Sequence, residues 1–240
     1  MSIERRLELL GNQGIEAYKR KQYAASLDAF TELRRLVPSD ERAIYFTALS
    51  LIRLEQKDSA IPHLKKLANE AKNSFYRLQG HMLLGYLFAT SQRGAESDLE
   101  LQALLRENYE NPQVYSILGY NAYQRKDFPQ AEYYYRKALE LDPENANAHN
   151  GLGCTYLEWT GRSEKALPHI ETALRIAPGT PSYLDSLGWF HFLKQNVAKA
   201  MFFLKKALRL KPHREIADHL KSVEADQVVR TRMGATRGRT

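Results

Sequence analysis

The side chains that could react with a substrate or hold a metal are scattered along this 240-residue sequence. It contains one cysteine, Cys154, and seven histidines, without a His-Glu-x-x-His, paired-cysteine or phosphate-cradling glycine motif. A lone cysteine forms no internal disulfide. His149 and Cys154 resemble a catalytic dyad, but a five-residue offset on a helix turns two side chains toward different faces. We therefore expect no enzyme activity, no metal site and no cofactor.

Aromatic and amide side chains follow a more regular spacing, and their chemistry suits peptide recognition. Tyrosine and tryptophan offer rigid apolar area, and an asparagine amide both donates to and accepts from a peptide backbone. The candidate peptide-binding residues are Tyr86, Tyr120, Tyr123, Asn147, Asn150, Cys154, Asp185 and Trp189. The alternative is that the aromatic residues pack between neighbouring helices. Both interpretations stay open for Tyr120 and Trp189, whereas the two asparagines favour binding.

These side chains recur because the sequence repeats with a period of about 34 residues. Six units follow one another, at 7–40, 41–74, 78–111, 112–145, 146–180 and 181–214. The clearest unit carries Tyr115, Leu118-Gly119, Ala131, Tyr135, Ala138 and Pro143. The fifth unit has one extra residue in its central turn, and Phe75–Arg77 form an apparent extension before the third. Exact tandem spacing of this kind predicts a repeat architecture.

The pattern resembles the tetratricopeptide repeat (TPR) signature, in which an aromatic residue, Leu-Gly, Tyr, Ala, a large apolar residue and proline stand at fixed offsets. The resemblance implies an all-α solenoid of antiparallel helix pairs wound into a right-handed superhelix. The glycine and alanine positions let the helices approach closely, Tyr135 or Leu204 fills the gap beside them, and Pro143 ends the second helix. The expected organisation is a lead-in at 1–6, six repeats at 7–214, a capping helix at 215–229 and a basic, disordered tail at 230–240.

The resemblance also implies where a partner binds. In TPR proteins one face of the first helix of each repeat lines a concave groove, and the candidate residues above occupy that face. A carboxylate clamp for chaperone C-terminal tails is not matched, because its positions carry Gly11, Ile15, Phe46, Gln79 and Leu83. The leading function is therefore a non-enzymatic scaffold or adaptor. It would bind a peptide or segment of a partner protein and support the assembly or regulation of a larger complex.

Positive charge gathers toward the C-terminus, although the net charge of the whole chain is only +7. Residues 186–214 hold seven lysines and arginines without a carboxylate, and the last eleven residues hold four arginines and no acid. The candidate electrostatic contacts are Lys205, Lys206, Arg209, Arg230, Arg232, Arg237 and Arg239. Such a face indicates nucleic acid, an acidic partner, an anionic membrane surface or simple solubility. Nucleic acid is not favoured, because no aromatic stacking platform is evident there.

Two further expectations concern the location of the protein and its self-association. No apolar stretch reaches the roughly 18–20 residues that span a bilayer. Met1–Arg6 is not followed by the apolar segment of a secretory leader, so we expect a cytoplasmic protein. The first repeat lacks a preceding cap, which leaves an edge able to stack on a second copy. A homo-oligomeric scaffold built by end-to-end stacking is thus a third functional hypothesis.

Overall fold

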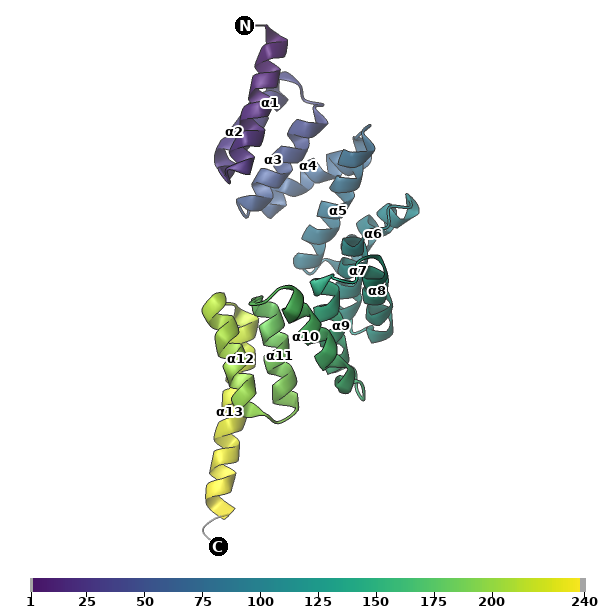
Figure 1. Ribbon diagram of the computed structural model, residues 1–240. Coiled ribbons are helices and arrows are strands. Elements are labelled where there is room, and N and C mark those ends of the chain that lie inside the picture. Colours follow the sequence, from purple (N-terminus) through teal and green to yellow (C-terminus); the bar gives the residue numbers. More distant parts are fainter. Residues whose placement is uncertain (1, 238–240) are drawn as a thin grey trace. The chain divides into compact units, whose positions relative to one another are not determined.

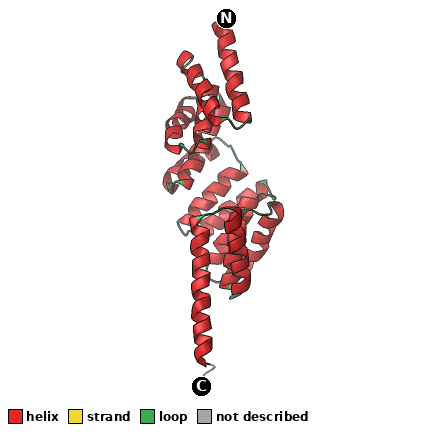
Figure 2. Cartoon of the chain, turned by 90° about the vertical axis from the view of Figure 1, so that its left-hand side faces the viewer, coloured by secondary structure: helices red, strands yellow, loops and turns green. Residues whose placement is uncertain are grey.

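The computed structural model describes residues 2–237, which form thirteen α-helices and one 3₁₀ turn and contain no strand (Figures 1 and 2). They divide into two compact units, the first ending at Glu110 and the second beginning at Asn111. Unit 1 contains α1 (Ile3–Lys19), α2 (Tyr23–Leu36), α3 (Glu41–Arg53), α4 (Lys57–Glu70), α5 (Ser74–Thr90) and α6 (Gly94–Arg106). Unit 2 contains α7 (Pro112–Gln124), α8 (Phe128–Leu141), α9 (Ala146–Glu158), η1 (Ser163–Lys165), α10 (Ala166–Ile176), α11 (Pro181–Leu193), α12 (Val197–Leu210) and α13 (Arg214–Arg237).

The helices form antiparallel pairs joined by tight turns. Five of the six hairpin turns contain a non-glycine residue in the left-handed region, with φ between 59° and 61°: Lys21, Glu55, Gln92, Lys126 and Gln195. The α9–α10 turn differs, because it contains the extra residue of the fifth repeat and adopts positive φ at Gly161. The extra residue thus lengthens the turn, which includes η1, and α9 and α10 still follow one another as a helix pair.

Short polar residues start many of the helices, and proline follows several of their ends. The side chains of Asp40, Asn111 and Asn145 accept hydrogen bonds of 2.8, 2.8 and 3.0 Å from backbone N–H groups in the first turns of α3, α7 and α9. Asn73 caps α5 in the same way, so Phe75–Arg77 belong to the first turn of this helix. The extension seen in the sequence therefore lengthens α5 to 17 residues and does not form a separate linker.

Glycine on the first helix and a large side chain on the second interlock within the repeats, as the sequence predicted. A Cβ atom at Gly119 would lie 2.8 Å from the ring of Tyr135, and one at Gly188 would lie 2.8 Å from Leu204. Unit 1 repeats the arrangement, because a Cβ atom at Gly14 would meet Phe30 at 2.5 Å. These close approaches set the distance between the helices of each pair and leave no room for a larger residue.

The last helix is longer than the sequence predicted. We expected a capping helix at 215–229, whereas α13 runs Arg214–Arg237, and only residues 238–240 of the expected tail lie outside the described part. Residues 224–237 contain no proline, so nothing in them forces the helix to stop. Ile216 and Val223 are buried against α11 and α12, while the C-terminal half of α13 extends past the neighbouring helices (Figure 2). No helix within 2–237 has the length and apolar character of a membrane span.

Candidate peptide-binding surface

The first helices of successive repeats line one side of unit 2. α7 contacts α9, α9 contacts α11 and α11 contacts α13, whereas the second helices α8, α10 and α12 do not contact one another. Helices that approach one another along an array lie on the inside of its curve. Seven of the eight candidate residues lie on these helices: Tyr120, Tyr123, Asn147, Asn150, Cys154, Asp185 and Trp189. We call them together the inner surface of unit 2.

Tyr86, the eighth candidate, lies in unit 1 on α5. Its side chain is 46% exposed, and Arg53 of α3 lies in the same neighbourhood. The hydrogen bond from Arg53 to Tyr18, with smaller contributions from nearby tyrosines including Tyr86, raises the pKa of this guanidinium. Tyr86 therefore belongs to an aromatic and cationic surface of unit 1 and is described separately from the other seven residues.

Asn150 and Cys154 begin a chain of polar contacts that joins α9 to α11. The Asn150 Nδ2 atom donates to Cys154 Sγ at 3.6 Å, and Sγ lies 3.2 Å from Ser186 Oγ, which donates to the Ser182 carbonyl at 3.0 Å. Burial raises the pKa of the Cys154 thiol to about 11, so the thiol stays protonated at neutral pH and is a poor nucleophile. The Oδ1 atom of Asn150 is buried without a hydrogen-bond partner in the described residues.

Asn147 and Tyr120 are the accessible members of the inner surface. Asn147 is exposed on the first turn of α9, and its Oδ1 atom accepts a 2.6 Å hydrogen bond from Tyr183. Tyr120 is 38% exposed on α7. Tyr123 is less accessible, because its hydroxyl donates to Glu158 and its ring packs near Phe128. Tyr183 was not a candidate from the sequence, because it faces its neighbouring repeat at a packing position.

The first turns of α13 close one end of the inner surface. His219 Nδ1 lies 2.9 Å from Asp185 Oδ1, and the imidazole stacks on Trp189 with centroids 4.4 Å apart. Asp185 and Trp189 are therefore in contact with α13. This contact could not be predicted from the sequence, because α13 lacks the repeat motif that would align it with α11.

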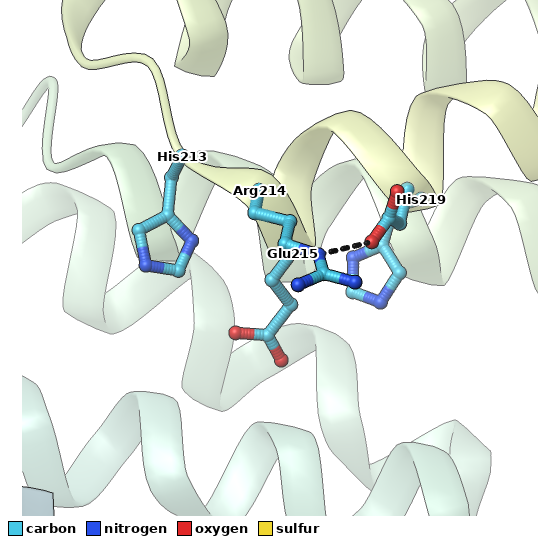
Figure 3. Close-up of a pocket in the computed structure, with 5 residues that line it drawn as sticks. His213, Arg214, Glu215 and His219 are labelled. Carbon is cyan, nitrogen blue, oxygen red and sulfur yellow. Dashed lines mark ion pairs between the residues drawn. The ribbon is translucent and has the colours of Figure 1, made fainter.

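An open pocket of about 330 Å³ lies beside this contact, lined by His213, Arg214, Glu215, Asp218 and His219 (Figure 3). Arg214 pairs with Asp218 at 3.8 Å, whereas Glu215 points away from the α13 ribbon. After burial, the negative charge of Glu215 is the largest influence that raises the pKa of Tyr120. The start of α13 thus adds a carboxylate near the exposed tyrosine of α7.

We expect the contact between α13 and α11 to weaken as pH rises. The hydrogen bond to Asp185 raises the pKa of His219 above its ordinary value of 6.5, against the effect of burial. A raised pKa in the folded state gives stabilisation that is complete below 6.5 and is lost as pH rises through the folded-state pKa. Because a protonated imidazole stacked on indole quenches its fluorescence, emission of a Trp159→Phe variant should rise with a midpoint above 6.5.

The matched control for this titration is His219→Gln in the same Trp159→Phe background, which keeps a hydrogen-bonding side chain but does not titrate. The fluorescence transition should be absent in that variant. A midpoint below the ordinary histidine pKa would contradict the expectation, since it would mean that burial outweighs the Asp185 contact.

The remaining histidines form no metal-binding group in the described part of the chain. His149 contacts His169, with their Nδ1 atoms 3.1 Å apart, and its other nitrogen lies 3.1 Å from the Pro143 carbonyl. Cys154 has different partners on α9 and α11. His149 and Cys154 therefore have separate sets of partners.

Three of the candidate electrostatic residues lie on α12, which is not one of the helices of the inner surface. Lys205, Lys206 and Arg209 are exposed on α12. Lys205 pairs with Glu224 of α13 at 3.8 Å. The backbones of Arg230, Arg232 and Arg237 belong to α13, but their side chains, and the whole of Arg239, lie outside the described part of the structure.

Comparisons with known proteins agree with this geometry. Residues 12–74 and 181–214 match tetratricopeptide repeat families, and residues 119–158 match a TPR repeat family. The chain is 26% identical over 212 residues to a TPR repeat-containing protein of Pseudomonas aeruginosa, PA4667, covering 87% of this chain and 35% of the relative. It is 23% identical over 203 residues to anaphase-promoting complex subunit 3 of Schizosaccharomyces pombe, covering 84% and 30%. The chain thus spans about a third of the length of these curated relatives.

A solved structure shares the fold along most of the chain. It is a tetratricopeptide repeat protein from Parabacteroides merdae, which superposes with a TM-score of 0.73 at 16% identity. The superposition covers 91% of this chain and 84% of that one. Identity this low carries information about architecture alone, namely an all-α solenoid of stacked helix pairs.

Proposed function

Because the chain belongs to the tetratricopeptide repeat family, we propose that it is a non-enzymatic scaffold that binds a segment of a partner protein on the inner surface of unit 2. The observation that carries the proposal is the accessible pair Tyr120 and Asn147, on the adjacent helices α7 and α9. A half-exposed tyrosine supplies apolar contact, and an asparagine amide supplies hydrogen bonds to an extended backbone. One relative, matched over 84% of this chain, is a subunit of the anaphase-promoting complex, which favours a role in complex assembly.

The other inner-surface residues have supporting roles in this proposal. Asn150 and Cys154 join α9 to α11, and Tyr123 fixes the end of α7 against α9 through Glu158. Asp185 and Trp189 are held by α13, so they form the closed end of the surface, and a partner segment would contact the open part first. Tyr86 lies on α5 of unit 1 and would contact a partner separately from this surface.

The proposal is tested by affinity capture with the unaltered 240-residue protein and a Tyr120→Ala/Asn147→Ala variant, with bound proteins identified by cross-linking and mass spectrometry. We expect the affinity of the variant for its partner to fall roughly tenfold or more, because truncating central aromatic anchors typically costs about 2 kcal/mol of binding free energy. Cross-links should map to α7 and α9.

The matched control is Tyr133→Ala on α8, since Tyr133 is 52% exposed but lies on a second helix, outside the inner surface. This variant removes a comparable exposed ring and should retain the partner. Equal retention by the inner-surface variant, or an equal loss in the control, would contradict binding at Tyr120 and Asn147.

A further inference from the structure

The outer face of α12 combines positive charge with an exposed aromatic ring. Its sequence VAKAMFFLKKALRL contains four basic residues and no acid. Lys199, Phe202, Lys206 and Arg209 are all exposed, and their spacing of three, four and three residues places them along one side of the helix. We call these four residues the α12 stripe.

Phe202 is unusually open for a phenylalanine, with 62% of its surface exposed. Its ring lies edge-on to Phe203, and Phe203 in turn stacks on His191 of α11. The base of the stripe is therefore fixed by aromatic packing while the ring of Phe202 faces solvent. The three cations of the stripe form no ion pair with any residue whose side chain the structure describes.

The stripe distinguishes α12 from the second helices of the other repeats. Leu99 on α6 and Tyr133 on α8 are also exposed apolar residues, at 64% and 52%. However, α6 contains three acids and α8 contains two, and α2, α4 and α10 each contain at least one. Only α12 among these six helices presents an apolar anchor surrounded by cations alone.

The stripe has no partner within the described residues. α12 contacts α11 and α13 and no other element, so the side carrying the stripe is free. The exposed side of a single helix is convex, so it fits a flat partner better than an extended peptide that needs a groove. Interfacial helices bind anionic bilayers with this combination, in which cations meet the lipid headgroups and an aromatic side chain enters the boundary with the acyl chains.

We propose that the α12 stripe binds the surface of an anionic membrane, with Phe202 inserted at the interface and Lys199, Lys206 and Arg209 over acidic headgroups. The stripe and the inner surface use different helices. The scaffold function and membrane attachment can therefore hold or fail separately.

The test is flotation of the unaltered 240-residue protein with vesicles of phosphatidylcholine, with or without about 30% phosphatidylglycerol. Binding is expected only to the anionic vesicles and should weaken with added salt. Lys199→Gln/Lys206→Gln/Arg209→Gln should reduce the partition coefficient about a hundredfold, since each cation near an anionic surface contributes about 1 kcal/mol. Phe202→Ser should reduce it about tenfold.

The matched control is Arg20→Gln/Lys65→Gln/Arg106→Gln, which removes three exposed cations from unit 1 and gives the same net charge. It should keep most of the vesicle binding, and circular dichroism should show all variants folded. Loss of binding equal to that of the stripe variant would mean that net charge alone matters and would overturn the proposal. Failure of the unaltered protein to float with anionic vesicles would overturn it as well.

Two further measurements separate a membrane from another polyanion. Phe202→Trp should add fluorescence that brominated lipids quench, relative to the unaltered protein, whereas Tyr133→Trp should not. Absence of quenching at position 202 would exclude insertion. A single-stranded RNA oligonucleotide should bind more weakly than the vesicles. Tighter RNA binding that disappears in the stripe variants would assign this face to nucleic acid and overturn the proposal.

Discussion

Replacing Tyr156 with alanine is expected to destabilise unit 2 by about 3–5 kcal/mol. Tyr156 is among the largest fully buried side chains of the described structure, with no exposed surface. Its hydroxyl donates to Glu132 Oε1 at 2.7 Å and accepts from Arg136 at 3.1 Å. Alanine would leave a cavity between α9 and α8 and would remove one hydrogen bond from a partly buried carboxylate.

Denaturant unfolding followed by tryptophan fluorescence measures this loss directly. Both tryptophans of the chain, Trp159 and Trp189, lie in unit 2 and report on that unit. Tyr156→Phe is the matched control, because it keeps the ring and removes only the hydroxyl, at an expected cost of about 1–2 kcal/mol. If the alanine variant were no less stable than the phenylalanine variant, the ring would contribute nothing to the core.

Gly151→Ala is expected to cost about 3 kcal/mol, although alanine normally favours a helix. The ring of Tyr135 lies against two positions that lack a side chain. A Cβ atom at Gly151 would lie 2.3 Å from its Cζ, and one at Gly119 would lie 2.8 Å from its Cδ1 and Cε1. Because Tyr135 is buried, its ring has little room to move away from an added methyl group.

A double-mutant cycle with Tyr135→Leu isolates this contact. The smaller leucine should leave space for the new methyl group, so Gly151→Ala should cost clearly less in the Tyr135→Leu background. Tryptophan fluorescence again reports on the unfolding of unit 2. An unchanged cost in the double variant, or a stabilising effect of Gly151→Ala alone, would show that the ring is not confined.

The repeat frame of the fold was predictable because its determinants are local and recur at a fixed period. The Leu-Gly pair of each clear repeat marks where a large side chain of the next helix fits, and the structure places Tyr135 and Leu204 there. Gly151 was not recognised, because it lies outside the repeating signature and its role depends on a ring from the preceding repeat. The length of α13 was underestimated for a related reason, since no motif marks its end.

The candidate surface was predictable in part. Position within the repeat placed seven candidate residues on α7, α9 and α11. It could not show that His219 contacts Asp185 and Trp189. These contacts join residues 34 and 30 positions apart, and His219 lies on a helix without repeat motifs. Similarly, the sequence identified the basic run, but only the exposure of Phe202 separates the α12 stripe from an ordinary solvated face.

The way helices meet in each unit also bears on how the chain folds. Within the described residues every helix contacts only the next helix or the one after it. The native contacts therefore have low contact order, and forming them closes only short loops of chain. A ribosome releases about 5–20 residues per second, so within each unit a hairpin can pack as soon as the next hairpin of that unit emerges. Folding can thus proceed from the N-terminus during synthesis, and little apolar surface stays exposed until a distant segment has been made.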